Sequence, residues 1–380
     1  MNYRAYVFIL LSCFFALLLT FSNAQALDLP VDVDLIYIYF DWDSTSCSTD
    51  AVDIRKNYSQ DIDYPEWTAS GNNSPFAYTM EHENPQVKAY FQCSEGGYVW
   101  KIDVNSNLTS GFEGLEFMEG QVVFPFQGAV PYGLGTLTAY ASLTHISKIT
   151  YNQFSWSVVR WYDTNGVAHT VNYHIGYTTP HTSYTLLDIP NQPWYFGAAQ
   201  GAGKKEPWID YVLDNACDWA SGCTNETNAI AAVTVGTFNY FESLGYGYFD
   251  MICAGGSSLY YSLTNLMSVG CEYNCEDMSA YIHLLMRSLG GMTQLIRVNE
   301  HIIDGKFYYK HYKTINSDNC KNDDWDFHQV DVCNNLISDA CGKLGCELIG
   351  TNLTKQTYKD SLYWYGTWYY TDPFETIQIF

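Results

Sequence analysis

The chain has 380 residues and a formal net charge of −23, with 18 Lys and Arg against 41 Asp and Glu. Binding to nucleic-acid phosphates depends on clustered Lys and Arg, so this balance argues against a nucleic-acid partner. Aromatic residues make up 17% of the chain, which is typical of β-rich structure and of surfaces that stack on sugars. The length exceeds that of one ordinary domain and predicts two.

Residues 1–26 predict a secretory signal peptide. Arg4 precedes an apolar run from Tyr6 to Leu19, and small residues at cleavage spacing follow, so we expect cleavage after Ala24 or Ala26. No later segment has the roughly eighteen consecutive apolar residues of a membrane span. We therefore expect a secreted, extracellular protein that is not a transmembrane protein. N-glycosylation sequons begin at Asn57, Asn72, Asn107, Asn225 and Asn352. They predict glycosylation in a host that modifies exported proteins.

The cysteine count leaves one thiol over. Of the 12 cysteines, Cys13 lies in the signal peptide, which leaves an odd number in the mature chain. Disulfides form in an oxidising compartment, so we expect several bridges and at least one unpaired thiol. Such a thiol is either an intermolecular link or a reactive group.

Residues 27–196 predict an antiparallel β-sandwich. Short apolar or alternating runs are separated by Gly, Asn, Asp and Pro clusters, residues 163–166 form a hairpin turn, and no segment has helical periodicity. The aromatic side chains of these strands could form a glycan-binding face or could pack in the core. Four histidines of this region match no metal-ligand spacing: His145, His169, His174 and His181. We therefore expect neither a metal nor a cofactor.

A Gly-rich segment, residues 197–205, predicts the linker to a second domain over residues 206–350. Helical spacing begins at Pro207 and continues to about residue 220, and a second helix is expected over 228–244. Cys217 and Cys223 bracket the end of the first helix and are expected to bridge. The aromatic segment 351–380 is expected to add strands to the second domain, although it could instead line a substrate groove.

The next predicted helix places Cys275 in its first turn. Apolar residues recur at helical spacing from Met278 to Leu289, Asn274 and Asp277 fit a capping box, and Gly290 fits a left-handed C-terminal cap. The positive end of a helix dipole and its unpaired N–H groups favour thiolate over thiol. Cys275 is therefore a candidate nucleophile, whereas the alternative is a buried or disulfide-bonded cysteine.

Residues 325–340 predict a β-hairpin that brings a histidine to a carboxylate. If Asn334 and Asn335 form a two-residue loop, Val330 lies opposite Asp339 and His328 is its diagonal neighbour on the same face. A carboxylate bonded to one ring nitrogen fixes the imidazole tautomer and leaves the other nitrogen for a nucleophile. His328 and Asp339 are thus candidate partners of Cys275.

These motifs, in this order, resemble the transglutaminase-like superfamily of papain-like thiol enzymes over roughly residues 206–350. The resemblance is carried by 275–279 at the start of a helix, 287–290 at its end, 327–328 and 337–340. It implies an α+β domain with a Cys275, His328, Asp339 triad that attacks an amide carbonyl. The sequence departs from the family pattern at Val330, where Trp is frequent, and in Cys271, which lies close enough to pair with Cys275.

We therefore expect a secreted cysteine-dependent amide hydrolase or acyl transferase, acting on a protein or peptide substrate as a protease, amidase or cross-linking enzyme. The alternative is a catalytically inactive extracellular binding or adhesion protein whose aromatic β-domain binds a glycan or a protein. A Cys271–Cys275 bridge would favour the alternative, and a free Cys275 thiol beside His328 would favour the enzyme.

Overall fold

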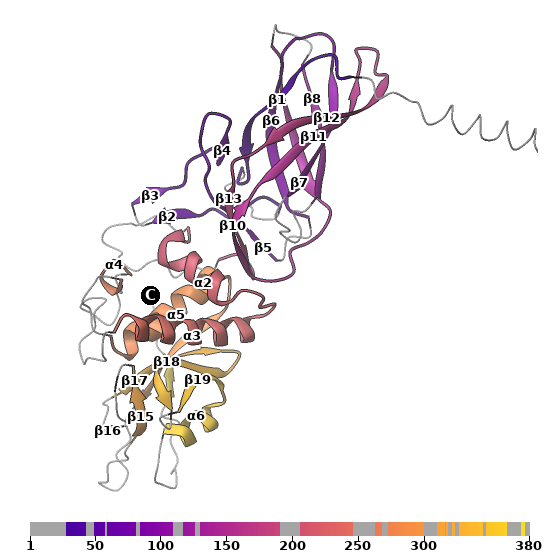
Figure 1. The fold of residues 1–380 in the computed structure, drawn as a ribbon. Helices are drawn as coiled ribbons and strands as arrows, with labels where there is room; N and C mark the ends of the chain where they lie inside the picture. Colours follow the sequence, from indigo (N-terminus) through magenta and orange to yellow (C-terminus); the bar gives the residue numbers. More distant parts are fainter. Residues whose placement is uncertain are drawn as a thin grey trace, which may run out of the picture.

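A computed structural model gives the fold of the chain (Figure 1). The predicted signal peptide, the predicted linker and Cys271 lie outside the residues that it describes. The described residues are 28–42, 49–57, 59–80, 84–108, 117–125, 130–190, 206–245, 263–267, 273–299, 310–315, 317, 321–323, 327–344, 347–362 and 374–376.

Most of the regular structure is strand, and its largest unit is a curled antiparallel sheet of 8 strands in the order β12-β11-β7-β8-β9-β6-β1-β4. Buried and more exposed residues alternate along β6 and β7, so one sheet face covers a core and the other faces outward. The predicted turn at 163–166 is present, since the Gly166 N–H donates to Asp163 O at 2.9 Å. The strands are β1 (Val33–Tyr39), β4 (Trp67–Thr68), β6 (Gln86–Cys93), β7 (Lys101–Leu108), β8 (Phe117–Val123), β9 (Tyr132–Ala139), β11 (Phe154–Tyr162) and β12 (Ala168–Tyr177).

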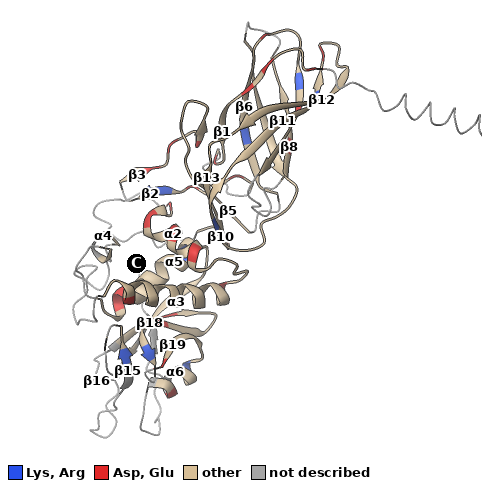
Figure 2. Ribbon diagram, viewed as in Figure 1, with Lys and Arg blue, Asp and Glu red and all other residues tan. Residues whose placement is uncertain are grey.

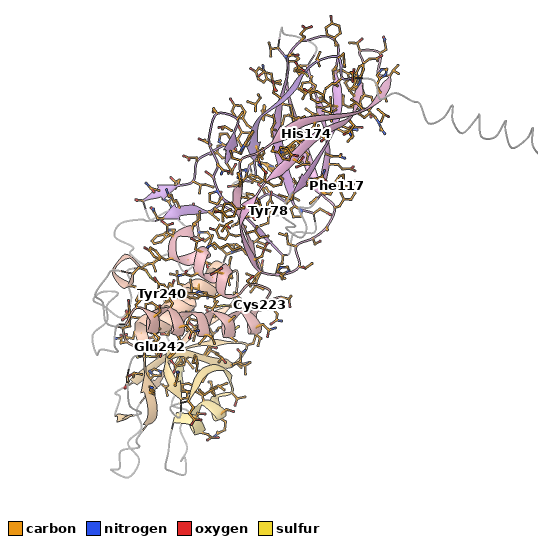
Figure 3. The ribbon with its side chains drawn as sticks, in the orientation of Figure 1. Tyr78, Phe117, His174, Cys223, Tyr240 and Glu242 are labelled. Carbon is orange, nitrogen blue, oxygen red and sulfur yellow. The ribbon has the colours of Figure 1, made fainter. Side chains whose placement is uncertain are left out.

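A smaller sheet joins this β-rich part to the helices. Its order is β10 (Ser147–Asn152), β13 (His181–Leu186) and β5 (Phe76–Thr79), and β2 (Arg55–Asn57) pairs with β3 (Gln60–Asp61) nearby. Because side chains alternate along a strand, Phe76 and Tyr78 enter the core of the large sheet while Ala77 enters the core around the helices. Figure 3 marks Tyr78 beside β10 and β13, at this junction.

The predicted helix over 207–220 is broken. Asp210 and Tyr211 have non-helical backbone angles, with Tyr211 at φ 64°, inside the irregular turn η1 (Ile209–Leu213). The α-helix starts only afterwards, as α2 (Asp214–Trp219), because a left-handed residue interrupts the helical hydrogen-bond ladder. The predicted Cys217–Cys223 bridge is wrong, since both residues carry free thiols. The remaining helices of this part are α3 (Glu226–Ser243), α4 (Leu263–Leu266) and α5 (Cys275–Ser288).

A second antiparallel sheet packs beneath α3 and α5 in Figure 1. Its path is β16-β15-β18-β17-β14-β20, with β19 paired to β18. The segment after residue 350 is not strand throughout, because 355–362 form a helix. Strand β20 joins the edge of the sheet by pairing with β14. The elements are β14 (Thr293–Asn299), β15 (Lys310–Thr314), β16 (Lys321–Asp323), β17 (Phe327–Cys333), β18 (Leu336–Leu344), β19 (Leu348–Leu353), α6 (Lys355–Leu362) and β20 (Phe374–Thr376).

Three observations on the described residues concern membranes, charge and metal ions. No helix within these ranges has the length and hydropathy needed to cross a bilayer. Lys and Arg appear in Figure 2 as a few blue positions scattered over several elements. Among the same residues, no group of three or more His, Cys, Asp or Glu side chains could hold a metal ion.

Candidate active site

Helix α5 begins with the predicted capping box. The Asn274 side chain accepts from the N–H groups of Glu276 and Asp277 at 2.9 and 3.0 Å, and the Asp277 carboxylate accepts from the Asn274 N–H at 3.2 Å. At the other end, Gly290 takes φ 87°, and a Cβ there would lie 2.4 Å from Asp188 O, so only glycine fits. Sequence-local signals therefore fix both ends of the helix.

Cys275 is the first residue of α5, and it carries a free thiol that is 4% exposed. At this position the sulfur lies at the positive end of the helix dipole. The Ser279 hydroxyl donates to the Cys275 carbonyl at 2.7 Å and accepts from Gln329 Nε2 at 2.9 Å. These two bonds connect the first turn of α5 to β17, the strand that carries His328.

The β17–β18 hairpin has the predicted two-residue loop. Asn334 and Asn335 have φ values of 52° and 64°, as a type I′ turn requires, and Cys333 pairs with Leu336 across it. The predicted contact follows from this register: His328 Nε2 lies 2.9 Å from Asp339 Oδ2, and both side chains are 1% exposed. The Nε2–H donates to the carboxylate, which leaves Nδ1 as the other ring nitrogen.

Further donors hold the Asp339 carboxylate in place. The Cys341 N–H donates to Oδ1 at 2.9 Å, and the Tyr358 hydroxyl donates to Oδ2 at 2.8 Å. Burial alone would raise the pKa of Asp339, but the charge of His328 and these hydrogen bonds lower it below its ordinary value. Asp339 is therefore a fixed, ionised partner for the imidazole.

The imidazole of His328 is held in its charged form. Burial opposes that charge, yet the Asp339 carboxylate and then the Cys275 sulfur outweigh burial and raise the pKa of His328 to about 9. Both interactions favour an imidazolium, and one of them is with the sulfur of the α5 cysteine. The three residues predicted from the sequence, Cys275, His328 and Asp339, are thus neighbours from α5, β17 and β18.

Three other described thiols, those of Cys93, Cys217 and Cys333, differ from Cys275 in their surroundings. Burial raises the pKa of Cys93 and of Cys333 to about 12, with nearby carboxylates adding to the effect. Burial also raises the pKa of the Cys217 thiol, which is fully buried. None of these three interacts with a histidine in the described part of the chain, so they are protonated at neutral pH.

A second buried histidine, His283, lies on α5, the helix that carries Cys275. His283 Nδ1 is 2.8 Å from the Thr293 hydroxyl and 3.7 Å from Asp331 Oδ1, and both residues of this His–Asp pair are buried. Burial raises the pKa of Asp331. No described cysteine or serine faces this pair as Cys275 faces His328, and the pair ties α5 to the sheet.

Two residues of the site, Gln329 and Tyr358, are not among the sequence candidates. Gln329 follows His328 directly, and its position on a strand gives no sign that it reaches α5. Tyr358 is one of 33 tyrosines, and nothing in its neighbours indicates that it contacts Asp339. Either residue can be identified as part of the site only from the way α6 and α5 pack on the sheet, and the sequence carries no local signal of that packing.

No protein-family model matches this chain, and a search of curated proteins finds no match. The chemistry of the site has to be inferred from its own residues.

Proposed function

We propose that this protein is a secreted cysteine-dependent amide hydrolase or acyl transferase. We also propose that its chain forms an N-terminal antiparallel β-sandwich followed by a transglutaminase-like α+β domain. Its strongest support is one observation: an ionised Asp339 bonded to His328, and His328 interacting with a free thiol at a capped helix N-terminus. This is the arrangement that thiol acyl-transfer chemistry needs.

In the proposed reaction the Cys275 thiolate attacks the carbonyl carbon of an amide and forms a C–S bond. The N–H of Cys275, at the start of α5, is a candidate donor to the developing oxyanion. When the tetrahedral intermediate collapses, the C–N bond breaks and the His328 imidazolium gives its proton to the leaving amine. A thioester on Cys275 remains.

The second half of the reaction decides the product. His328, now neutral, takes a proton from the acceptor as that acceptor attacks the thioester, and Cys275 leaves as thiolate. Water as acceptor gives hydrolysis, and a primary amine gives a new amide bond. Asp339 keeps the imidazole oriented through both steps.

The first test is alkylation of the native protein with iodoacetamide from about pH 5 to about pH 9, mapped by peptide mass spectrometry. We expect Cys275 to react with a rate midpoint well below the ~8.5 of a free cysteine, while Cys93 and Cys333 stay unlabelled. His328→Ala should move that midpoint upward. His283→Ala is the matched control, because it removes a buried histidine of α5 that hydrogen-bonds Thr293 and lies beside Asp331 instead.

The triad is ruled out if Cys275 stays inert until the protein unfolds, or if His328→Ala and His283→Ala have the same pH profile. A second assay separates the two reactions. Wild type and Cys275→Ser are incubated with casein and a fluorescent primary amine: incorporation of the amine indicates transfer, and release of ammonia or peptide fragments without incorporation of the amine indicates hydrolysis. Equal results for the two proteins would reject both activities for this substrate class.

A further inference from the structure

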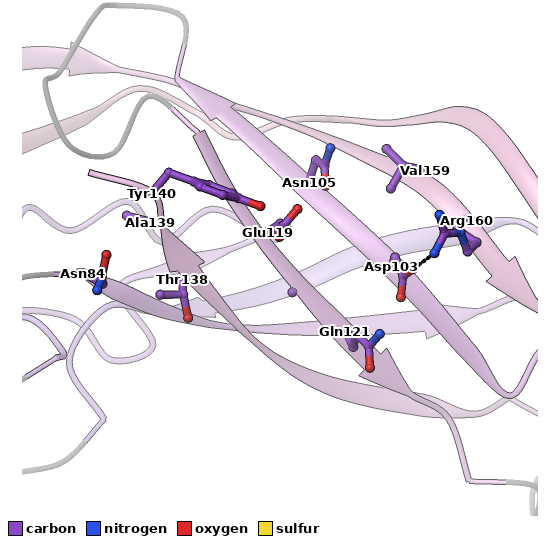
Figure 4. A pocket seen from close by; sticks show the side chains of 11 residues that line it. Asn84, Asp103, Asn105, Glu119, Gln121, Thr138, Ala139, Tyr140, Val159 and Arg160 are labelled. Carbon is purple, nitrogen blue, oxygen red and sulfur yellow. Dashed lines mark ion pairs between the residues drawn. The ribbon is translucent and has the colours of Figure 1, made fainter. Parts of the chain in front are cut away.

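The outer face of the large sheet carries a polar groove that the proposed reaction does not use. Figure 4 shows it across β7, β8, β9 and β11, and its volume is about 660 Å³. Small-molecule sites in proteins are commonly of this size.

Strand register explains why polar side chains gather there. Asp103 pairs with Gln121 and with Arg160, and Asn105 pairs with Glu119, which pairs in turn with Thr138. Paired residues of adjacent strands lie on the same face, and alternate residues lie on the opposite face. The side chains between them, such as Val104 and Val122, are fully buried in the core.

The lining presents both hydrogen-bond donors and acceptors. Asn105 and Gln121 offer amides that can do both, Thr138 offers a hydroxyl, and the Glu119 carboxylate accepts. Asp103 Oδ2 is held by the Tyr162 hydroxyl at 3.1 Å and lies 3.5 Å from Arg160 Nη1. Asp103 Oδ1 is buried and has no hydrogen-bond partner among the described residues, so the acceptors that the groove presents to a ligand are the oxygens of Glu119, Asn105 and Gln121. A ligand rich in hydroxyl groups fits this set.

Charge and apolar content narrow the class of ligand. Asp103 and Glu119 outnumber the one basic lining residue, Arg160, which already lies beside Asp103. Phosphate, sulfate and uronate ligands would therefore be repelled. Protein interfaces rely on buried aromatic or aliphatic anchors, whereas this lining has only Val159 and Ala139 besides one tyrosine.

That tyrosine, Tyr140, supplies a flat surface at one end of the groove (Figure 4). Its side chain is 60% exposed, its ring packs against Phe117 with centroids 5.2 Å apart, and its hydroxyl bonds Glu119. The packing and the hydroxyl bond both restrain the ring. The apolar C–H face of a sugar ring can lie on such an aromatic face.

We propose that this groove binds a neutral oligosaccharide. Amide, carboxylate and hydroxyl groups on β7, β8 and β9 would pair with sugar hydroxyls, and Tyr140 would contact one sugar ring. Several of the large aromatic side chains that are conspicuous in the sequence of the N-terminal strands are instead buried in the core, among them Phe91, Phe154 and Trp156. The recognition surface is polar.

The test is isothermal titration of the full-length protein with a panel of neutral hexasaccharides: cellohexaose, mannohexaose, xylohexaose, laminarihexaose, maltohexaose and chitohexaose. The protein is made in a host that adds no N-glycans, because the sequon residue Asn107 lies two positions after Asn105 on β7. At least one sugar should bind. Gln121→Ala and Asn105→Ala should each weaken that binding about tenfold, the effect of losing roughly one good hydrogen-bond pair.

Gln92→Ala is the matched control. Gln92 lies on the outer face of β6 in the same sheet and does not line the groove, so its loss should leave the affinity unchanged. The proposal is overturned if no sugar of the panel binds at millimolar concentration, or if Gln121→Ala and Gln92→Ala bind equally. Cys275→Ser should bind like wild type, so this result is independent of whether the thiol is catalytic.

Discussion

The Tyr358 hydroxyl and His328 Nε2 meet at one atom, Asp339 Oδ2, at 2.8 and 2.9 Å. Tyr358→Phe removes one of the two donors while leaving the ring in place. We expect the free energy of unfolding to fall by about 1 to 2 kcal/mol, because a buried carboxylate loses a hydrogen bond. The alkylation rate of Cys275 should fall several-fold, because Asp339 no longer orients the imidazole as tightly.

Tyr184→Phe is the control for that variant. The Tyr184 hydroxyl donates to Asp214 Oδ1 at 2.7 Å, so the substitution breaks the same kind of bond far from Asp339 along the chain. Chemical denaturation should show a loss of stability in both variants. If both also slowed alkylation of Cys275 to the same extent, Tyr358 would have no specific link to the site.

Asp339→Asn should change the pH dependence of both stability and reactivity. In the wild type the pKa of His328 lies at about 9, above the ordinary value of 6.5, so its contribution to stability is present below pH 6.5 and disappears as the pH rises to about 9. Without the carboxylate, only the interaction with Cys275 still opposes burial, so the pKa of His328 falls. The decline of the melting temperature between these pH values should then be smaller, and the alkylation midpoint of Cys275 should move upward.

Two matched variants distinguish the effect of the α5 capping box on Cys275 from the effect of helix capping on stability in general. Asn274→Ala should cost about 1 kcal/mol of stability and should also slow Cys275 alkylation, because the first turn of α5 loses its anchor. Asn225→Ala is the matched variant, since Asn225 caps α3 by accepting from the Asn228 N–H at 2.9 Å. Its cost in stability should be similar, and its alkylation profile should equal that of the wild type.

Buried carboxylates near β4 should make the protein less stable as the pH rises. Burial raises the pKa of Glu66 from 4.5 to about 7, and burial together with a hydrogen bond to Asp53 raises that of Asp41 to about 9. The folded state holds these protons more tightly than the unfolded state does, so the stability present below pH 4.5 decreases as the pH rises through 7. For Glu66 the loss is of the order of 3 kcal/mol.

Thermal melting at about pH 5 and about pH 8 measures this effect. Glu66→Gln should reduce the difference between the two melting temperatures, because its side chain cannot ionise. The exposed Glu95 serves for comparison, and Glu95→Gln should leave the difference as it is in the wild type. A wild type that melts at a higher temperature at the higher pH would contradict the expected direction.

Local signals account for the parts of the site that the sequence could predict. The capping box, the helical spacing after Cys275 and the Asn334–Asn335 turn each depend on neighbours within a few residues, and the turn alone brings His328 to Asp339. Local signals also suggested features that are not present. Tyr211 interrupts the helical pattern around it, and Cys217 and Cys223 are close in sequence but do not bridge.

The remaining features depend on packing between distant segments. Tyr358 reaches Asp339 only because α6 folds back over β18, and Gln329 reaches Ser279 only because α5 lies on β17. The outer groove needs the order of β11, β7, β8 and β9, in which β11 follows β9 in sequence but lies beside β7. Strand order of this kind is set by the whole core and has no local signature.

Strand β5 limits how this protein can be divided. Its successive side chains enter two different cores, and Leu289 O, at the end of α5, accepts from the N–H groups of Leu187 and Asp188, which follow β13. A chain starting at residue 206 would therefore lack Ala77, Tyr184 and Leu186 from its core and would expose apolar surface. A recombination event or an engineered fusion that joined only the cysteine-bearing half to another protein would transfer an incomplete core. The smallest part of the chain that keeps a complete core around the helices therefore includes the β-rich part.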